Sequence, residues 1–342
     1  MPERQKRVTL KDVADYCGLS RSLVAFIISN SGYRNSTPEN RRKVAEAVKA
    51  LNYRPNTAAR ELRARKSSTI GVAMPMSGTG IYGNMALELQ REIKKRGFTS
   101  LFSFWGGDDS QELHAQTLQT FFERSISGVI SWDASPCFRE EKIPAVVYGY
   151  RNEFYDYVIL DEEQMIIRAL EHLKKFGHRR IGMISVRPRK MRLNERWAGF
   201  HAEMHRHGLL SEIAFVEEAG WDADTVSGGA AAAASLLRKG LNGATALLAL
   251  NDNMALGAIQ VFQENKIRIP EQLSVIGIGN DSRVTELCRP ALTTMALDNR
   301  RLGQLAMRAL LDVMRHPKAG GNAVTLLPMT LCEGESVCDG PF

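Results

Sequence analysis

The 342-residue sequence predicts an α/β protein in which a small helical head precedes a larger two-lobed body built on parallel sheets. Positive charge is concentrated at the start: residues 1–66 carry 15 Lys and Arg against 6 Asp and Glu. From residue 69 onward, short apolar runs alternate with amphipathic helical patterns, as in sheets covered on both faces. No run of 18 uncharged apolar residues occurs, so no membrane span is expected.

The charge asymmetry favours a head that binds a polyanion. Residues 1–66 have a net charge of +9 and residues 67–342 a net charge of −2, which together give the +7 of the whole chain. The first ten residues lack the apolar core of a secretory signal, and the five cysteines are scattered without a CxxC motif or a His cluster. We therefore expect a cytoplasmic protein with reduced thiols, no metal site and no cofactor.

Three short helices in residues 1–54 predict a helix-turn-helix. Thr9 and Asp12 have the spacing of a capping box at the start of the first helix. Gly18 ends that helix, Ser20 can cap the second, and Thr37 can cap the third. The second helix of this motif enters the major groove of DNA. Its outward side chains are expected to be Arg21, Ser22, Ala25, Phe26 and Ser29.

The runs 8–14, 18–20 and 51–56 resemble the head of lactose-repressor-family regulators, and the resemblance continues through the rest of the chain. It implies a transcriptional repressor that binds a pseudo-palindromic operator as a homodimer, under the control of a small effector. The expected DNA-contacting residues of the head are Thr9, Leu10, Ser20, Arg21, Ser22, Phe26, Ser29, Asn40, Tyr53 and Asn56.

The second helix departs from the family pattern. Leu23-Val24-Ala25-Phe26 stands where the family usually has Thr-Val-Ser-Arg, and Ser29 stands where it has Asn. Phe26 cannot make the bidentate contact to guanine that an Arg makes, but it can pack on a thymine methyl group or within the head. An effector-binding protein whose head has lost its affinity for DNA is therefore an alternative to the regulator.

Residues 55–68 are expected to form a hinge helix and a linker. Asn56 can cap a helix that is too short to be stable alone. The resemblance implies paired hinge helices in the minor groove, with Leu62 wedged between base pairs and Ala59 on the same face. A flexible linker with an incidental Leu is the alternative.

In the body, the resemblance implies the architecture of the periplasmic binding proteins. The first lobe is expected to contain residues 69–160 and 295–319, and the second residues 161–294 and 320–342, with crossings near 158–161, 292–298 and 320. The expected strands are 69–75, 99–105, 128–132, 145–148, 180–186, 214–217, 244–250 and 273–278, with helices at 85–96, 162–176, 192–207 and 226–238.

An oxidoreductase is the rival class, because residues 78–83 read GTGIYG, a literal dinucleotide-binding pattern. The glycines begin several residues past the apolar core of the preceding strand. The first acidic residue after the second strand is Asp108, beyond the strand end where a ribose-binding carboxylate belongs. The sequence also lacks GxSxG, HExxH and Walker A motifs, so we expect no enzyme. The histidines of the helix at 192–207 are expected on its solvated face.

The effector pocket that the resemblance implies is lined by Tyr82, Trp132, Asp161, Arg196, Trp221, Asn251, Asn280 and Asp281. The fork of Arg196 suits hydroxyl pairs or a carboxylate, although a surface ion pair is the alternative. Whether Gly279, Asn280 or Asp281 replaces the family's usual pocket Asp is open. Aromatic side chains among polar ones favour a sugar-like ligand, while a nucleobase or another metabolite stays possible.

Overall fold

The computed structural model describes residues 8–28, 36–53, 67–75, 80–105, 110–149, 153–186, 192–210, 213–219, 225–316 and 323–340. The chain divides into two compact units, Met1–Ser67 and Ser68–Phe342. No helix in the described ranges is long and apolar enough to cross a membrane.

The described part of the first unit contains α1 (Leu10–Cys17), α2 (Arg21–Ile28) and α3 (Pro38–Ala50). Gly18 follows α1 with a φ of 65°, a left-handed conformation that glycine adopts without strain. Val13, Val24 and Val44 form a small buried core, one from each helix. The three-helix head predicted from the capping residues and the apolar spacing is therefore confirmed.

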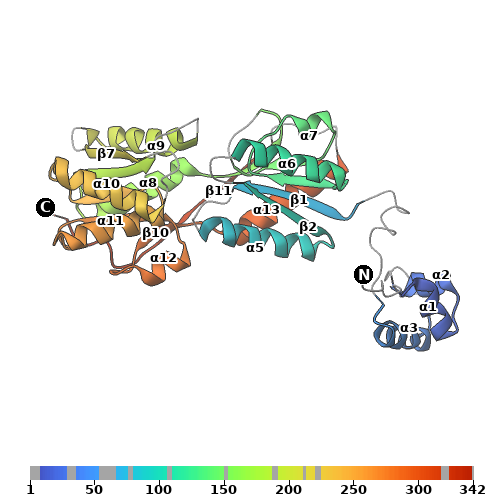
Figure 1. Cartoon of the computed structure of the whole chain (residues 1–342). Helices are drawn as coiled ribbons and strands as arrows, with labels where there is room; N and C mark the ends of the chain where they lie inside the picture. Colours follow the sequence, from blue (N-terminus) through green and yellow to red (C-terminus); the bar gives the residue numbers. More distant parts are fainter. Residues whose placement is uncertain are drawn as a thin grey trace. The chain divides into compact units, whose positions relative to one another are not determined.

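The first lobe of the second unit is built on a six-stranded sheet whose strands are all parallel, in the order β11-β5-β4-β3-β1-β2 (Figure 1). Its strands are β1 (Thr69–Pro75), β2 (Thr99–Trp105), β3 (Gly128–Ser131), β4 (Ala145–Val147), β5 (Asp156–Leu160) and β11 (Val324–Leu327). Its helices are α5 (Gly80–Lys95), α6 (Ser110–Glu123), α7 (Cys137–Glu140) and α13 (Asn299–Arg315).

Alternate residues of these strands face opposite helical layers, as the two-residue period of a strand requires. Val72, Ile130 and Val146 pack in a core that includes α5 and α13. Their neighbours, such as Val129 and Val147, pack in a second core with α6 and α7. Continuous burial of β1, β3 and β4 follows from this double coverage.

The second lobe has a six-stranded sheet in the order β12-β10-β9-β8-β6-β7, parallel except for the β10–β12 pair. Its strands are β6 (Ile181–Val186), β7 (Ile213–Ala219), β8 (Ala246–Ala249), β9 (Ser274–Gly279), β10 (Thr293–Ala296) and β12 (Thr330–Cys332). Its helices are α8 (Glu162–Lys175), α9 (Arg192–Arg206), α10 (Val226–Lys239), α11 (Asp252–Glu264) and α12 (Ser282–Leu287). Helices α8 and α9 pack on one face of this sheet, and helices α10 and α11 pack on the other face.

The chain passes between the two sheets three times, each time from the carboxyl end of a strand: from β5 to α8, from β10 to α13, and from β11 to β12. The carboxyl edges of both sheets are therefore joined at these crossings. In open α/β sheets, ligands bind beyond this edge. Side chains that directly follow β3, β4, β5, β8 and β9 consequently belong to the side where the two lobes meet.

The lobe boundaries differ from the expected ones in two places. Val324–Leu327 pairs with β5 in the first sheet, so the third crossing follows residue 327 instead of residue 320. Met295 and Ala296 pair with β9 in the second sheet, so the second crossing follows residue 296, which lies within the expected range 292–298 but two residues after the expected boundary of the second lobe. Both segments are short, and which sheet each one joins depends on pairing with strands far away in the sequence.

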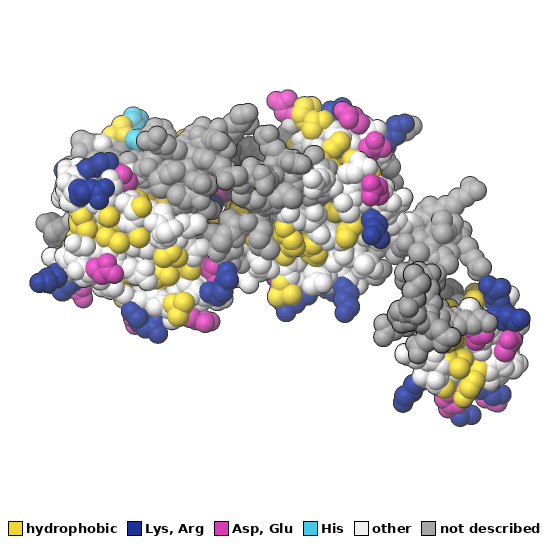
Figure 2. All heavy atoms as spheres, viewed as in Figure 1, with side chains coloured by type: hydrophobic (Ala, Val, Ile, Leu, Met, Phe, Trp, Pro, Cys, Tyr) yellow, Lys and Arg dark blue, Asp and Glu magenta, His cyan; other side chains and the backbone are white. Residues whose placement is uncertain are grey.

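On the face drawn in Figure 2, basic and acidic side chains are interspersed over the body.

Candidate functional site

The exposed face of α2 carries the side chains expected to meet DNA. Arg21 and Ser22 are exposed in its first turn, and Phe26 is 37% exposed one turn later. Val24 points the other way and is completely buried in the head core. Because residues four apart lie on the same side of a helix, Ser22 and Phe26 share one face.

Four other residues expected at the DNA hold the head together. The Thr9 hydroxyl accepts a hydrogen bond from Asp12 N–H at 3.3 Å, while the Asp12 carboxylate accepts from Thr9 N–H at 2.7 Å. Ser20 accepts from Leu23 N–H at 3.2 Å and caps α2. Leu10 and Tyr53 pack against the core of the head. These residues therefore cap α1 and α2 and pack against the core of the head.

Asn40 lies in the first turn of α3, where its backbone N–H donates to the Thr37 hydroxyl at 3.2 Å. Its side chain is half-buried. Ser29, Asn56, Ala59, Leu62 and Trp221, all expected in one of the two sites, lie outside the described residues.

Aromatic side chains cluster at the carboxyl edge of the first sheet. Trp132 follows β3 and meets Tyr82 of α5 edge to face, with ring centroids 5.3 Å apart. Trp132 also meets Tyr148, which follows β4, edge to face with ring centroids 5.4 Å apart. Gly149 permits this arrangement, because a Cβ there would collide with the backbone of Trp132. Tyr82, Trp132 and Tyr148 therefore form an aromatic cluster at this edge, and two of them, Tyr82 and Trp132, are residues expected to line the pocket.

In the second lobe, Arg196 of α9 is held by Glu162, the first residue of α8. Nε donates to one carboxylate oxygen, and Nη2 donates to the other at 2.9 Å. Nη1 donates to the carbonyl of Leu250, just after β8, at 2.7 Å. The neighbouring Asp161 caps α8 by accepting from Gln164 N–H at 3.2 Å. Arg196 is thus engaged in an ion pair, but the pair is buried and is not the surface pair that was the alternative.

The turns after β8 and β9 are joined through a buried carboxylate. Asn251 caps α11, accepting from Met254 N–H at 2.8 Å. The next residue, Asp252, accepts from Asp281 N–H at 2.7 Å and from the Thr294 hydroxyl at 2.5 Å. Burial raises the pKa of Asp252 to about 6, against the effect of these hydrogen bonds, which lower it.

The three residues that compete for the position of a pocket Asp have different roles. Gly279 ends β9 with a φ of 129°, a backbone conformation that suits glycine. Asn280 is exposed, and its amide lies 3.8 Å from the Cys332 sulfur. Asp281 is 3% exposed and caps α12 by accepting from Arg283 N–H at 3.2 Å. Of these three residues, only Asn280 therefore has an exposed side chain.

Three residues of this edge escaped the sequence analysis as site candidates: Tyr148, Glu162 and Asp252. Tyr148 follows a short apolar strand, which is a usable signal because the residues after such strands line the edge. Glu162 and Asp252 each directly follow a chosen residue, Asp161 and Asn251. Their contacts with Arg196 and Thr294 are tertiary, and the sequence pattern carries no trace of them.

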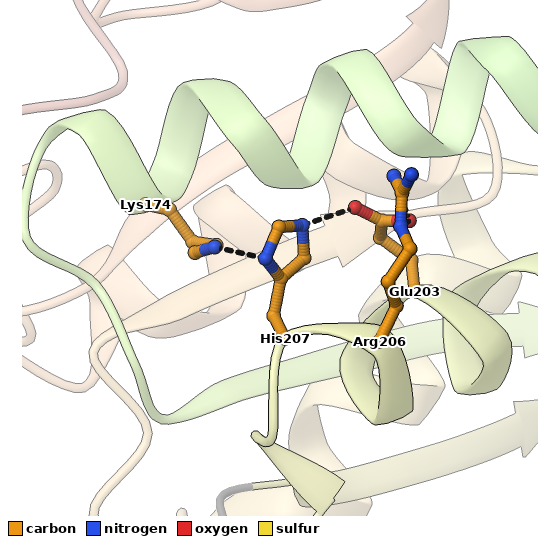
Figure 3. Close-up of polar contacts among 4 residues, drawn as sticks. All are labelled: Lys174, Glu203, Arg206 and His207. Carbon is orange, nitrogen blue, oxygen red and sulfur yellow. Dashed lines mark hydrogen bonds and ion pairs between the residues drawn. The ribbon is translucent and has the colours of Figure 1, made fainter.

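A separate polar cluster joins the ends of α8 and α9 (Figure 3). His207 Nε2 lies 2.5 Å from a carboxylate oxygen of Glu203, and Nδ1 contacts Lys174 Nζ. Because an ammonium group can only donate, Nδ1 accepts and Nε2–H donates to Glu203. Arg206 donates to the second Glu203 oxygen at 2.8 Å. His207 therefore bridges two helices, with 26% of its side chain exposed. Within the described ranges no group of His, Cys, Asp and Glu could hold a metal ion.

Comparisons with known proteins agree with this architecture. A model of the bacterial regulatory proteins of the lacI family matches residues 9–56, and a model of the periplasmic binding protein-like domain matches residues 170–337. The chain is 29% identical to the HTH-type transcriptional repressor PurR of Vibrio cholerae, over 89% of this chain and 90% of that protein. It is 26% identical to the ribose operon repressor of Haemophilus influenzae, over 94% and 96%.

Among solved structures, the Lac repressor bound to ONPG in the repressed state superposes with a TM-score of 0.82 at 25% identity, covering 97% of this chain and all of that one. A ribose-bound LacI-family regulator from Enterococcus faecium has the same fold in the body, with a TM-score of 0.68 at 23% identity over 80% of this chain. These relatives are regulators, which favours the regulator over the oxidoreductase that GTGIYG raised. The three-helix head, the two-lobed body and both family models place this chain in the lacI family of bacterial regulatory proteins.

Proposed function

We propose that this chain is a transcriptional repressor that binds a pseudo-palindromic operator as a homodimer, under the control of a sugar-like effector held between the two lobes. The observation that carries the DNA-binding part is the exposed face of α2 with Arg21, Ser22 and Phe26, in a head of strongly positive charge. The relatives named above are repressors, and one Lac repressor structure is a dimer bound to operator.

The effector is proposed to bind at the joined carboxyl edges. Tyr82 and Trp132 would stack on an apolar ring face, and Asp161, Asn251 and Asn280 would offer polar groups to ring substituents. Arg196, Asp281 and Trp221 are the remaining members of the proposed pocket. Arg196 and Asp281 would contribute through the contacts described above. This function needs no catalysis, metal or cofactor, and it places the protein in the cytoplasm with the DNA.

Control of DNA binding would run through residues 55–68. Two copies of this segment, with Ala59 and Leu62 facing the minor groove, would pair only when the two bodies are suitably spaced. An effector that binds one arrangement of the lobes better than another would change that spacing. Effector and operator must then alter each other's affinity by the same factor.

The test compares the full chain with residues 67–342 on a fluorescent duplex pool across a range of salt concentrations. The logarithm of the full chain's affinity should fall linearly with the logarithm of the salt concentration, because the head releases counterions from phosphates. Residues 67–342 should show no such slope. Equal slopes for both proteins would overturn the assignment of DNA binding to the head. Absence of binding by the full chain would favour an effector-binding protein with an inactive head.

A further inference from the structure

The guanidinium of Arg196 is already bound by a carboxylate of the same chain. The Glu162 carboxylate accepts hydrogen bonds from Nε and Nη2, and the Leu250 carbonyl accepts one from Nη1. The two side chains are 14% and 6% exposed. An exposed pair such as Arg42–Glu46, at 67% and 61%, contributes little to stability, but a buried two-pronged pair behaves differently.

Removing one partner of a buried ion pair leaves the other charge buried without compensation. An acidic ligand that sought Arg196 would therefore have to displace Glu162 and strand its carboxylate. Glu162 also holds its position without an entropic cost of association, since α8 is fixed by its Asp161 cap and by a buried apolar face. Arg196 should therefore bind Glu162 in preference to a carboxylate or phosphate from solution.

We infer that Glu162 sets the chemical class of the effector: it takes the Arg196 fork that an acidic ligand needs, so the pocket accepts a neutral or amine-bearing hydroxylated molecule and rejects carboxylates and phosphates. This inference rests on the proposed effector site. A carboxylate oxygen has about two lone-pair positions, so one that accepts from Arg196 can also accept from a ligand hydroxyl or ammonium group. Glu162 is then a specificity-determining residue at the crossing between the lobes.

The experiment uses the full-length chain and inorganic phosphate as the anionic probe, with binding followed by calorimetry. Glu162→Gln removes the charge at nearly constant shape and replaces one of the two acceptor oxygens by a donor, which releases one arm of the Arg196 fork. Glu163→Gln is the matched control, because Glu163 is the next residue of α8 and is exposed. The double variant Glu162→Gln/Arg196→Gln reports phosphate bound elsewhere, above all by the basic head.

E162Q should bind phosphate about tenfold more tightly than the wild type, the gain of one hydrogen bond between charged groups. E163Q should match the wild type, and the double variant should lose the gain. Equal phosphate binding by wild type and E162Q would overturn the inference, as would a gain that persists in the double variant. None of these outcomes involves DNA, so failure of the proposed DNA binding is seen separately in the salt experiment.

If E162Q does not fold, the wild type alone decides. In an NMR titration of the wild type, the Nε–H resonance of Arg196 is identified by its loss in Arg196→Lys. This resonance should not move as phosphate is added, up to the concentration that saturates the basic head. A saturable shift of that resonance would show that phosphate reaches Arg196 past Glu162, and the inference would be wrong.

Discussion

The carboxylate of Asp252 accepts a hydrogen bond from the hydroxyl of Thr294 at 2.5 Å, across 42 residues of sequence. Its other oxygen accepts from Asp281 N–H at 2.7 Å. One buried side chain thus ties the start of α11 to β10 and to the turn after β9. Gly277 makes room for it, because a Cβ at that position would collide with the Asp252 carboxylate. The carboxyl edge of the second sheet is held in shape by this contact.

The first prediction concerns the pH dependence that Asp252 imposes. Burial raises its folded-state pKa to about 6, above the ordinary value of 3.8. The folded protein therefore binds this proton more tightly than the unfolded chain, and the associated stability is present below pH 3.8 and lost as the pH rises through 6. The shift corresponds to about 3 kcal/mol. Asp252→Asn should remove this fall from the unfolding free energy measured by denaturant between pH 4 and 7.

Comparing the wild type with D252N isolates the contribution of Asp252 to the pH dependence of stability. Burial lowers the pKa of His172, His178 and His201, and their contribution changes in the opposite direction, since stability is lost as the pH falls below 6.5. These histidines are common to both proteins, so only Asp252 enters the difference. Asp312→Asn, on the exposed side of α13, should reproduce the wild-type curve. Parallel curves for D252N and wild type would contradict the prediction.

The second prediction concerns the close packing of α10 on α11. A Cβ on Gly257 would collide with the carbonyl oxygen of Val226, and one on Gly229 with the backbone of Met254. Gly257→Ala should therefore lower the free energy of unfolding by about 3 kcal/mol, the cost of forcing two backbones apart. Gly83→Ala is the control of opposite sign: Gly83 lies in α5 with open space around it, so alanine should add about 1 kcal/mol. Denaturant unfolding measures both, and a neutral G257A would refute the close approach.

The third prediction concerns Arg21, the exposed first residue of α2. Arg21→Ala should weaken duplex binding and reduce the slope of log affinity against log salt by about 1, if the guanidinium neutralises one phosphate. Arg315→Ala removes an exposed positive charge at the end of α13 in the body and should leave the slope unchanged. Fluorescence anisotropy at several salt concentrations gives both slopes. An R21A slope equal to that of the wild type would exclude a phosphate contact by Arg21.

Much of the fold could be predicted because local patterns determine it. The strands at Thr69–Pro75 and Thr99–Trp105 have the bounds read from their apolar runs, and the three head helices follow from their caps. Periodicity missed β5, which has five residues, and β10, β11 and β12, which have three or four residues each. Such strands exist because a distant edge accepts them, as β5 accepts β11, and no local signal reports that pairing.

The site was predictable in position more than in chemistry. Trp132 was chosen as an aromatic residue and Asn251 from the family resemblance, and both directly follow parallel strands, at the carboxyl edge where ligands bind in such sheets. The occupation of Arg196 by Glu162 could not be found, because 34 residues separate them and only the packing of α9 on α8 brings them together.

The measurement that tests the central account most directly is the selection of duplexes from a random pool by the purified full-length chain at moderate salt. The account predicts an enriched pseudo-palindrome with two half-sites, one for each head of a dimer. The same selection with Phe26→Ala should change the enriched bases within the half-site and keep the spacing. A wild-type pool with no enriched sequence would contradict the account.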